Sequence, residues 1–263
     1  LNDKDTGAPL AHMSANILSA YRTGAIPGVG VKYFAKEDAK VVGVVGPGVM
    51  GKTALAATMA VREDIDTIKI KGRSQKSIDN FIAYVKEEFP SIVNIEIVED
   101  IESAVRGCDV VILATSTPTG DPSLYPYVKE EWIKPGAVIA CPAAARFDDD
   151  FIINRARNVT DNIELYEAWA EECPYPAYEI IPIPAVNCMD LIHDGKMTMD
   201  QIDDLGDVII GDVPKKRDEN EIVIYSVGGM PIEDVAWGTV VYRNAVEKGI
   251  GQSINLWETP HLA

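Results

Sequence analysis

The stretch GPGVMGKT at residues 46–53 decides the fold. Its three glycines have the G-x-G-x-x-G spacing of the turn that places a dinucleotide pyrophosphate at a helix N-terminus. Such a turn needs a strand before it and a helix after it. The apolar run at 40–45 meets the first requirement, and the helix-forming residues 53–62 meet the second. The stretch therefore predicts a phosphate-binding turn between a strand and a helix.

The same eight residues also fit a second phosphate-binding pattern. Gly46 and Gly51, followed by Lys52 and Thr53, have the G-x-x-x-x-G-K-[ST] spacing of the loop that cradles nucleoside triphosphates. A triphosphate site needs an acidic residue at the end of another apolar strand to hold magnesium. The natural candidate strand, 109–116, ends in Ala-Thr-Ser, so that carboxylate is missing. The surroundings favour the dinucleotide interpretation.

The end of the second strand indicates which dinucleotide binds. A dinucleotide fold predicts a strand roughly 20 residues past the glycines, ending in the residue that contacts the adenosine ribose. The segment TIKIK at 67–71 has this position and runs into Gly72, Arg73 and Ser74, with Lys76 close by. NAD sites usually carry Asp or Glu there, whereas the 2′-phosphate of NADP suits Arg. NADP(H) is therefore favoured and NAD(H) is possible; alternatively, Arg73 and Lys76 are ordinary solvated charges.

Composition limits the possible classes of partner. The chain has 263 residues and a net charge of −17, which argues against nucleic-acid or anionic-membrane binding. No apolar run is long enough to span a bilayer, and we expect no signal peptide. The four cysteines lack C-x-x-C spacing and the three histidines are dispersed. We therefore expect a cytoplasmic protein with reduced thiols and no metal site.

Short apolar segments alternate with helical segments through most of the chain. This alternation predicts an α/β fold of the Rossmann type, with a doubly wound parallel sheet. The prolines at 173–184 and the charged residues at 213–220 predict loops. The expected strands are 40–45, 67–71, 94–98, 110–114, 137–141, 159–160 and 221–226, and the expected helices are 53–62, 75–88, 101–106, 148–155, 163–171, 199–206 and 231–248.

The first residues predict a different kind of structure. We expect a hairpin over 2–11, a helix from an N-cap at Ser14 through Arg22, and a second helix over 28–35. These elements and the C-terminal helix are predicted to form a second, small domain.

We place the domain boundaries accordingly. The dinucleotide-binding Rossmann domain is expected at 36–230, and a substrate and dimerisation domain at 1–35 together with 231–263. The chain starts with Leu1 rather than Met, directly in the hairpin, so we expect something to precede it and the second domain to be incomplete.

Ligands of open α/β sheets bind outside the carboxyl ends of the strands. Residues at these ends, together with the glycine turn and the end of the second strand, are the expected cofactor contacts. They are Gly46, Gly48, Val49, Met50, Gly51, Arg73, Ser74, Lys76, Thr115, Ser116, Ala140, Ser226 and Gly228.

Four stretches, at 1–11, 21–25, 46–51 and 226–234, give the chain a resemblance to the ornithine cyclodeaminase and mu-crystallin family. They lie in the family's order and span nearly the whole chain. The resemblance implies an NAD(P)-binding Rossmann domain, a homodimer, and a small amino or imino acid as substrate. It also implies an N-terminal segment before Leu1 that carries further substrate-binding Arg and Lys residues.

The resemblance makes Arg22 the guanidinium that holds the substrate carboxylate. A bidentate Arg neutralises and orients such a carboxylate and so fixes the α-carbon against the nicotinamide. The alternative is that Arg22 is a helix-surface residue. No other catalytic residue is assigned.

The cyclising members of the family carry an Asp, in a stretch like Gly-Asp-x-Pro-Gly-Lys, that handles protons on the substrate amine. An ungapped comparison places Ala140 at that position, and alanine is neither an acid nor a base. The residues at 148–150 are acidic but suit the first turn of the next helix. We therefore expect an NAD(P)H-dependent oxidoreductase of the amino-acid dehydrogenase or ketimine reductase type. The alternatives are a lyase that uses bound NAD(P) catalytically and a cofactor-binding protein without catalysis.

Overall fold

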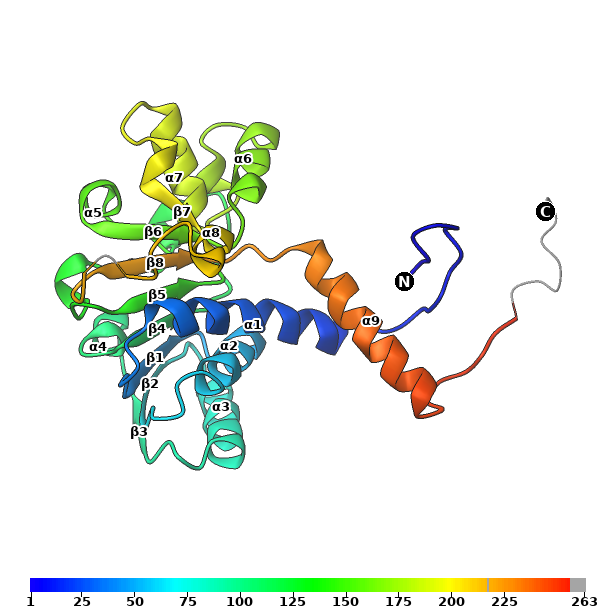
Figure 1. Ribbon diagram of the computed structural model, residues 1–263. Helices are drawn as coiled ribbons and strands as arrows, with labels where there is room; N and C mark the ends of the chain where they lie inside the picture. Colours follow the sequence, from blue (N-terminus) through cyan, green and yellow to red (C-terminus); the bar gives the residue numbers. More distant parts are fainter. Residues whose placement is uncertain (217, 256–263) are drawn as a thin grey trace. The chain divides into compact units, whose positions relative to one another are not determined.

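The computed structural model describes residues 1–216 and 218–255. The chain divides into two compact units (Figure 1). The larger unit comprises residues 20–229, and the smaller comprises residues 1–19 together with the chain from Met230 onward.

The larger unit is built on an eight-stranded sheet whose order is β3-β2-β1-β4-β5-β8-β6-β7. All of the pairings are parallel, which confirms the predicted parallel sheet. The order reverses between β1 and β4, so the sheet has its switch point beside the strand that precedes the glycine turn. The strands are β1 Val41–Val45, β2 Thr67–Lys71, β3 Asn94–Ile97, β4 Val110–Leu113, β5 Val138–Cys141, β6 Ala156–Thr160, β7 Ile202–Asp204 and β8 Ile222–Ser226.

Alternate residues of the central strands enter two separate hydrophobic cores. In β4, Val110 and Ile112 belong to one core, whereas Val111 and Leu113 belong to the other. Successive side chains of a strand point to opposite faces, so a strand buried on both faces is apolar throughout. Helices cover both faces, as the doubly wound arrangement requires (Figure 1).

The helices divide between these two cores. Buried residues of α1, α2, α3 and α8 pack in one, and those of α4, α5, α6 and α7 pack in the other. The helices are α1 Asn16–Phe34, α2 Val49–Met59, α3 Gln75–Glu88, α4 Ile101–Val105, α5 Asp149–Asn154, α6 Ile163–Glu172, α7 Pro184–His193, α8 Leu205–Ile210 and α9 Pro231–Glu247.

Helix α1 differs from the prediction, because the two helices expected before residue 36 are one continuous helix with Pro27 inside it. Gly24 and Gly28 lie where α1 crosses α2. A Cβ atom added to Gly24 would lie 2.1 Å from Thr53 Oγ1, and one added to Gly28 would lie 2.5 Å from Ala57 Cβ. The glycines therefore permit close helix contact, and this packing stabilises the helix across the proline.

The region from 173 to 211 holds two further corrections. Helix α7 was not predicted; Pro184 stands at its first turn, where a proline needs no N–H partner. The helix predicted over 199–206 is instead a 3₁₀ turn, strand β7 and the start of α8, which ends at Gly211 with φ 94°. Asp203 of β7 is buried, and its carboxylate pairs with Arg157 of β6 at 2.7 Å.

In the smaller unit, the predicted hairpin is present as an antiparallel bridge between Asn2 and Pro9. Helix α9 begins at Pro231, as predicted. Several of its apolar side chains are exposed, among them Ile232, Val235 and Val240. None of the helices within the described ranges is both long enough and apolar enough to cross a membrane.

Candidate functional site: a dinucleotide cleft

The three glycines of the β1–α2 turn have three different environments. Gly46 has φ +100°, and an added Cβ atom would lie 2.4 Å from the carbonyl oxygen of Ala114. Gly51 packs against the turn itself, since an added Cβ atom would lie 2.4 Å from the oxygen of Gly46. Gly48 has no atom within 4 Å of an added Cβ position. A tight turn, close helix packing and open backbone are the features that let a pyrophosphate approach a helix N-terminus.

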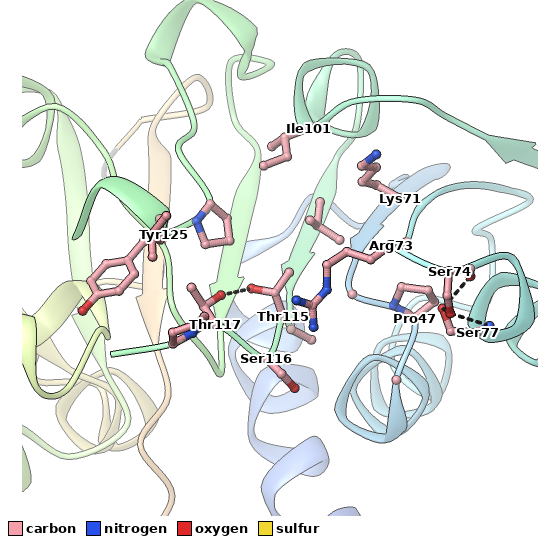
Figure 2. Close-up of a pocket in the computed structure, with 18 residues that line it drawn as sticks. Pro47, Lys71, Arg73, Ser74, Ser77, Ile101, Thr115, Ser116, Thr117 and Tyr125 are labelled. Carbon is pink, nitrogen blue, oxygen red and sulfur yellow. Dashed lines mark hydrogen bonds between the residues drawn. The ribbon is translucent and has the colours of Figure 1, made fainter. Parts of the chain in front are cut away.

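This turn borders a cleft of about 890 Å³ at the carboxyl ends of β1, β2 and β4 (Figure 2). The cleft lies at the switch point of the sheet, where open α/β folds bind their ligands. Helix α2 begins here with Gly48 as its N-cap, and its first turn contains no acidic side chain. The unpaired N–H groups and the positive end of the helix dipole suit an anionic phosphate.

Lys52 and Thr53, which suggested a triphosphate site, are occupied elsewhere. The ammonium of Lys52 lies 5.0 Å from the centre of the Tyr84 ring. The hydroxyl of Thr53 donates within α2 to the carbonyls of Val49 and Met50, at 3.2 and 3.3 Å. Neither residue lines the cleft. The geometry therefore agrees with the dinucleotide interpretation of the glycine turn.

The end of β2 contributes Gly72, Arg73 and Ser74 to the cleft. A Cβ atom at Gly72 would lie 2.8 Å from both Pro47 Cγ and Ile78 Cγ1, so no acidic side chain fits there without displacing its neighbours. Arg73 is exposed, and its side chain extends into the cleft toward Thr115 (Figure 2). Among the described residues, the guanidinium of Arg73 has no hydrogen-bond or ion-pair partner.

Ser74 and Lys76 have different surroundings. Ser74 is the N-cap of α3, and its hydroxyl oxygen accepts a hydrogen bond from the N–H of Ser77 at 3.3 Å. Its hydroxyl is thus partly committed to the helix. Lys76 is exposed on the first turn of α3 and does not line the cleft.

The loop after β4 forms the opposite wall. Thr115 and Ser116 line the cleft, together with Thr117, whose hydroxyl lies 3.0 Å from that of Thr115. The sequence did not single out Thr117. Its signal was its position directly after two predicted contacts. Other lining residues missed from the sequence include Pro47, Lys71, Ser77 and Tyr125.

Seven predicted contacts lie outside the cleft lining: Val49, Met50, Gly51, Lys76, Ala140, Ser226 and Gly228. The side chain of Ala140 is completely buried in the core beside α1 and α2. Ser226 is 2% exposed, and its hydroxyl oxygen accepts a hydrogen bond from the N–H of Ala185 at 3.0 Å. These two side chains stabilise the fold, so any contact they make with a cofactor uses the backbone.

The strand β5 places Ala140 before the end of the strand, so the loop that faces ligands begins after Cys141. Residues 142–147 contain no acidic side chain. Asp148 is the N-cap of α5, and Asp149 and Asp150 form its first turn, as predicted. The hydroxyl of Tyr127 donates to Asp148 at 2.7 Å. The expected lack of a carboxylate therefore extends over the whole start of this loop.

A carboxylate that the sequence did not single out follows β6. Asp161 is 7% exposed, and its Oδ2 accepts hydrogen bonds from the N–H groups of Gly228 and Gly229, at 2.9 and 2.8 Å. Its Oδ1 accepts from the hydroxyl of Tyr166 at 2.7 Å. Burial raises the pKa of Asp161 above its usual value, although these hydrogen bonds oppose the shift.

Arg22 lies beside the turn that Asp161 holds. A Cβ atom added to Gly229 would lie 2.4 Å from Nη1 of Arg22. Arg22 is half-buried in α1. The predicted carboxylate-binding residue thus contacts the chain directly after β8.

Comparison with known proteins agrees with this geometry. The model of the ornithine cyclodeaminase/mu-crystallin family matches residues 1–249. The alanine dehydrogenase of Archaeoglobus fulgidus is 30% identical over 262 residues, which covers 98% of this chain and 73% of the relative.

Two solved structures share the fold. Thermococcus litoralis Δ1-pyrroline-2-carboxylate reductase, in complex with NADH and L-proline, matches with a TM-score of 0.77 and 25% identity, covering 96% of this chain and 72% of that one. An archaeal alanine dehydrogenase dimer with bound NAD matches with a TM-score of 0.77 and 27% identity, covering 97% of this chain and 73% of that one.

Proposed function

Because the chain belongs to the ornithine cyclodeaminase/mu-crystallin family, we propose that it is an NAD(P)-dependent oxidoreductase acting on a small amino acid or its imine. The observation that carries the proposal is the glycine turn at the switch point, where Gly48 leaves open space at the N-terminus of α2. The similar alanine dehydrogenase and pyrroline-carboxylate reductase support this class of reaction.

We propose NADP(H) as the preferred cofactor. The solved relatives contain NADH or NAD, so the preference rests on this chain's own residues. Gly72 places no carboxylate at the ribose position, and a carboxylate there would repel a 2′-phosphate. Arg73 extends into the cleft with its guanidinium available, and this planar group suits a phosphate through charge-assisted hydrogen bonds. Ser74 adds a hydroxyl, and Lys76 adds positive charge nearby.

The bound nicotinamide supplies the hydride donor or acceptor. In the oxidative direction, the α-carbon of the amino acid loses hydride and its amine loses a proton, which leaves an imine. Arg22 holds the substrate carboxylate, and the two-pronged guanidinium fixes the α-carbon for hydride transfer. Residues 142–147 offer no carboxylate for this proton, so we propose a bound water molecule as its acceptor, with a residue of the family's N-terminal segment as the alternative. This absence also disfavours a lyase that needs an acid at this place.

We further propose a homodimer in the cytoplasm. The archaeal alanine dehydrogenase is described as a dimer, and α9 of this chain exposes apolar residues that suit a protein interface. Cys108, Cys141, Cys173 and Cys188 are free thiols, in agreement with a reducing compartment.

The test is a substrate panel followed by the absorbance of reduced nicotinamide. Small L-amino acids with NADP⁺ or NAD⁺ test oxidation, and cyclic imines or 2-oxo acids with ammonia and NADPH or NADH test reduction. We expect turnover with net change in the nicotinamide and higher efficiency with NADP(H). Proline and ammonia from ornithine without net change would identify a lyase. Cofactor binding without any turnover would identify a binding protein.

A further inference from the structure

Asp161 holds the chain where β8 leaves the sheet. Strands β6 and β8 are neighbours, with Thr160 paired to Ser226, so Asp161 follows β6 at the edge where the chain enters Val227 and Gly228. The Asp161 carboxylate reaches across this edge and accepts both glycine N–H groups on one oxygen. Two short hydrogen bonds to one charged oxygen fix the orientation of both peptides.

The second oxygen of Asp161 also accepts hydrogen bonds. Tyr166, which is completely buried, donates its hydroxyl to Oδ1, and the N–H of Asn162 donates to the same atom at 3.1 Å. The carboxylate therefore has partners on both oxygens and cannot rotate without losing hydrogen bonds. It is a rigid anchor rather than a mobile acid, and it does not face the cleft.

The glycine turn that Asp161 anchors is in contact with Arg22. Gly229 has φ +77°, which L side chains rarely adopt, and its added Cβ atom would overlap Nη1 of Arg22 at 2.4 Å. The guanidinium of Arg22 therefore occupies the space beside Gly229 that a side chain at this position would take. Any movement of this backbone changes where Nη1 can lie.

We propose that Asp161 is a positioning residue for substrate binding: through the peptides of Gly228 and Gly229 it fixes the place of the Arg22 guanidinium. The inference rests on the proposed function, in which Arg22 binds the substrate carboxylate. Asp161 itself contacts neither the carboxylate nor the cofactor cleft. Its replacement therefore changes the fit of the substrate and leaves cofactor binding intact.

The first variants are Asp161→Ala and Asp161→Asn. Alanine leaves both glycine N–H groups and the Tyr166 hydroxyl without their acceptor. Asparagine retains one acceptor oxygen for the glycines and turns its amide toward the Tyr166 hydroxyl, which also accepts, so that it loses only the hydrogen bond from the N–H of Asn162. With the best substrate of the panel, we expect Asp161→Ala to raise KM by about tenfold or more. Asp161→Asn should restore most of this loss, while the Kd of NADPH stays within about threefold for both variants.

A second variant tests the same contact independently, in case Asp161→Ala does not fold. Gly229→Ala adds the atom that overlaps Nη1 of Arg22, and the flexible end of that side chain moves aside. Its matched control is Gly195→Ala, because Gly195 has φ +69° but no atom within 4 Å of an added Cβ. Both variants carry the same kind of backbone strain. Only Gly229→Ala should raise the substrate KM, again with an unchanged Kd for NADPH.

Arg22→Ala separates failure of the inference from failure of the proposed function. If Arg22→Ala raises the substrate KM but Asp161→Ala and Gly229→Ala do not, the positioning role is wrong and the proposed function stands. If Arg22→Ala itself has no effect on KM, the proposed carboxylate contact is wrong and the positioning role fails with it. A protein without turnover on the panel overturns both. Equal losses of substrate and cofactor affinity in Asp161→Ala and Asp161→Asn would show a general structural defect.

Discussion

Arg73 is the residue whose replacement separates the two cofactors most directly. Charge-assisted hydrogen bonds contribute about 1.5–3 kcal/mol, so Arg73→Ala should lower the affinity for NADPH by about tenfold or more. The affinity for NADH should change little, because NADH has no 2′-phosphate for the guanidinium. Titration of each cofactor by fluorescence measures both. Equal losses would show that Arg73 binds another part of the dinucleotide.

Gly48 and Lys52 distinguish the two phosphate-binding patterns at the level of single residues. Gly48→Val should abolish dinucleotide binding with little change in the melting temperature, because the added side chain enters open space in the free protein. Lys52→Ala should leave the Kd within about threefold, since its ammonium lies over Tyr84 and not in the cleft. Calorimetric titration with NADPH measures both effects. ATP hydrolysis that disappears in Lys52→Ala would contradict the dinucleotide interpretation.

Part of the site could be predicted from the residues alone. Gly46, Gly48 and Gly51 were predictable because their spacing matches three requirements of a pyrophosphate-binding turn: a positive φ, open backbone and close helix packing. Asp161 was not, because its importance depends on the pairing of β6 with β8, which lie far apart in sequence. Ser226 was placed at the correct strand end. Its hydroxyl, however, accepts a hydrogen bond from the first turn of α7, a helix that the sequence analysis missed.

At the scale of elements, the crossing of α1 over α2 depends on Gly24. An added methyl group at Gly24 meets Thr53 at 2.1 Å, and part of that contact is backbone. Gly24→Ala should therefore destabilise the larger unit by about 1–3 kcal/mol, the usual cost of overpacking. Urea unfolding measures this, with Gly48→Ala as the control that adds the same group in open space. Equal stability of the two variants would mean that the helices separate without cost.

Asp109, directly before β4, makes the free energy of unfolding depend on pH. Burial alone would raise the pKa of Asp109, but hydrogen bonds from Lys134 and from the N–H groups of Lys40 and Val41 hold it below 3.8. Because the folded pKa is depressed, this stabilisation is present above pH 3.8 and is lost as the pH falls through the folded pKa. Asp109→Asn should reduce the free energy of unfolding near neutral pH and flatten its acid dependence below 3.8. An unchanged acid dependence would show that other carboxylates determine it.

For the whole molecule, alternation of strands and helices was sufficient to predict the parallel sheet. The burial of β4 on both faces explains why. A strand that is apolar at every position, such as VVIL, is typical of a parallel sheet covered by helices on both faces. The errors lie where tertiary packing overrides the local pattern. The stretch predicted as one helix over 199–206 contains strand β7, whose Asp203 forms a buried ion pair with Arg157 of β6. The two helices predicted before residue 36 are one helix, which packs on α2.

The stoichiometry of nicotinamide conversion tests the central claim most directly. The protein is incubated with a cyclic imino acid, or with a 2-oxo acid and ammonia, and NADPH, and the amino acid formed is measured beside the NADPH consumed. We predict equal molar amounts, because each α-carbon receives one hydride from the nicotinamide. Amino acid and ammonia formed from ornithine with no net consumption of NADPH would contradict the proposed oxidoreductase and leave the dinucleotide fold in place.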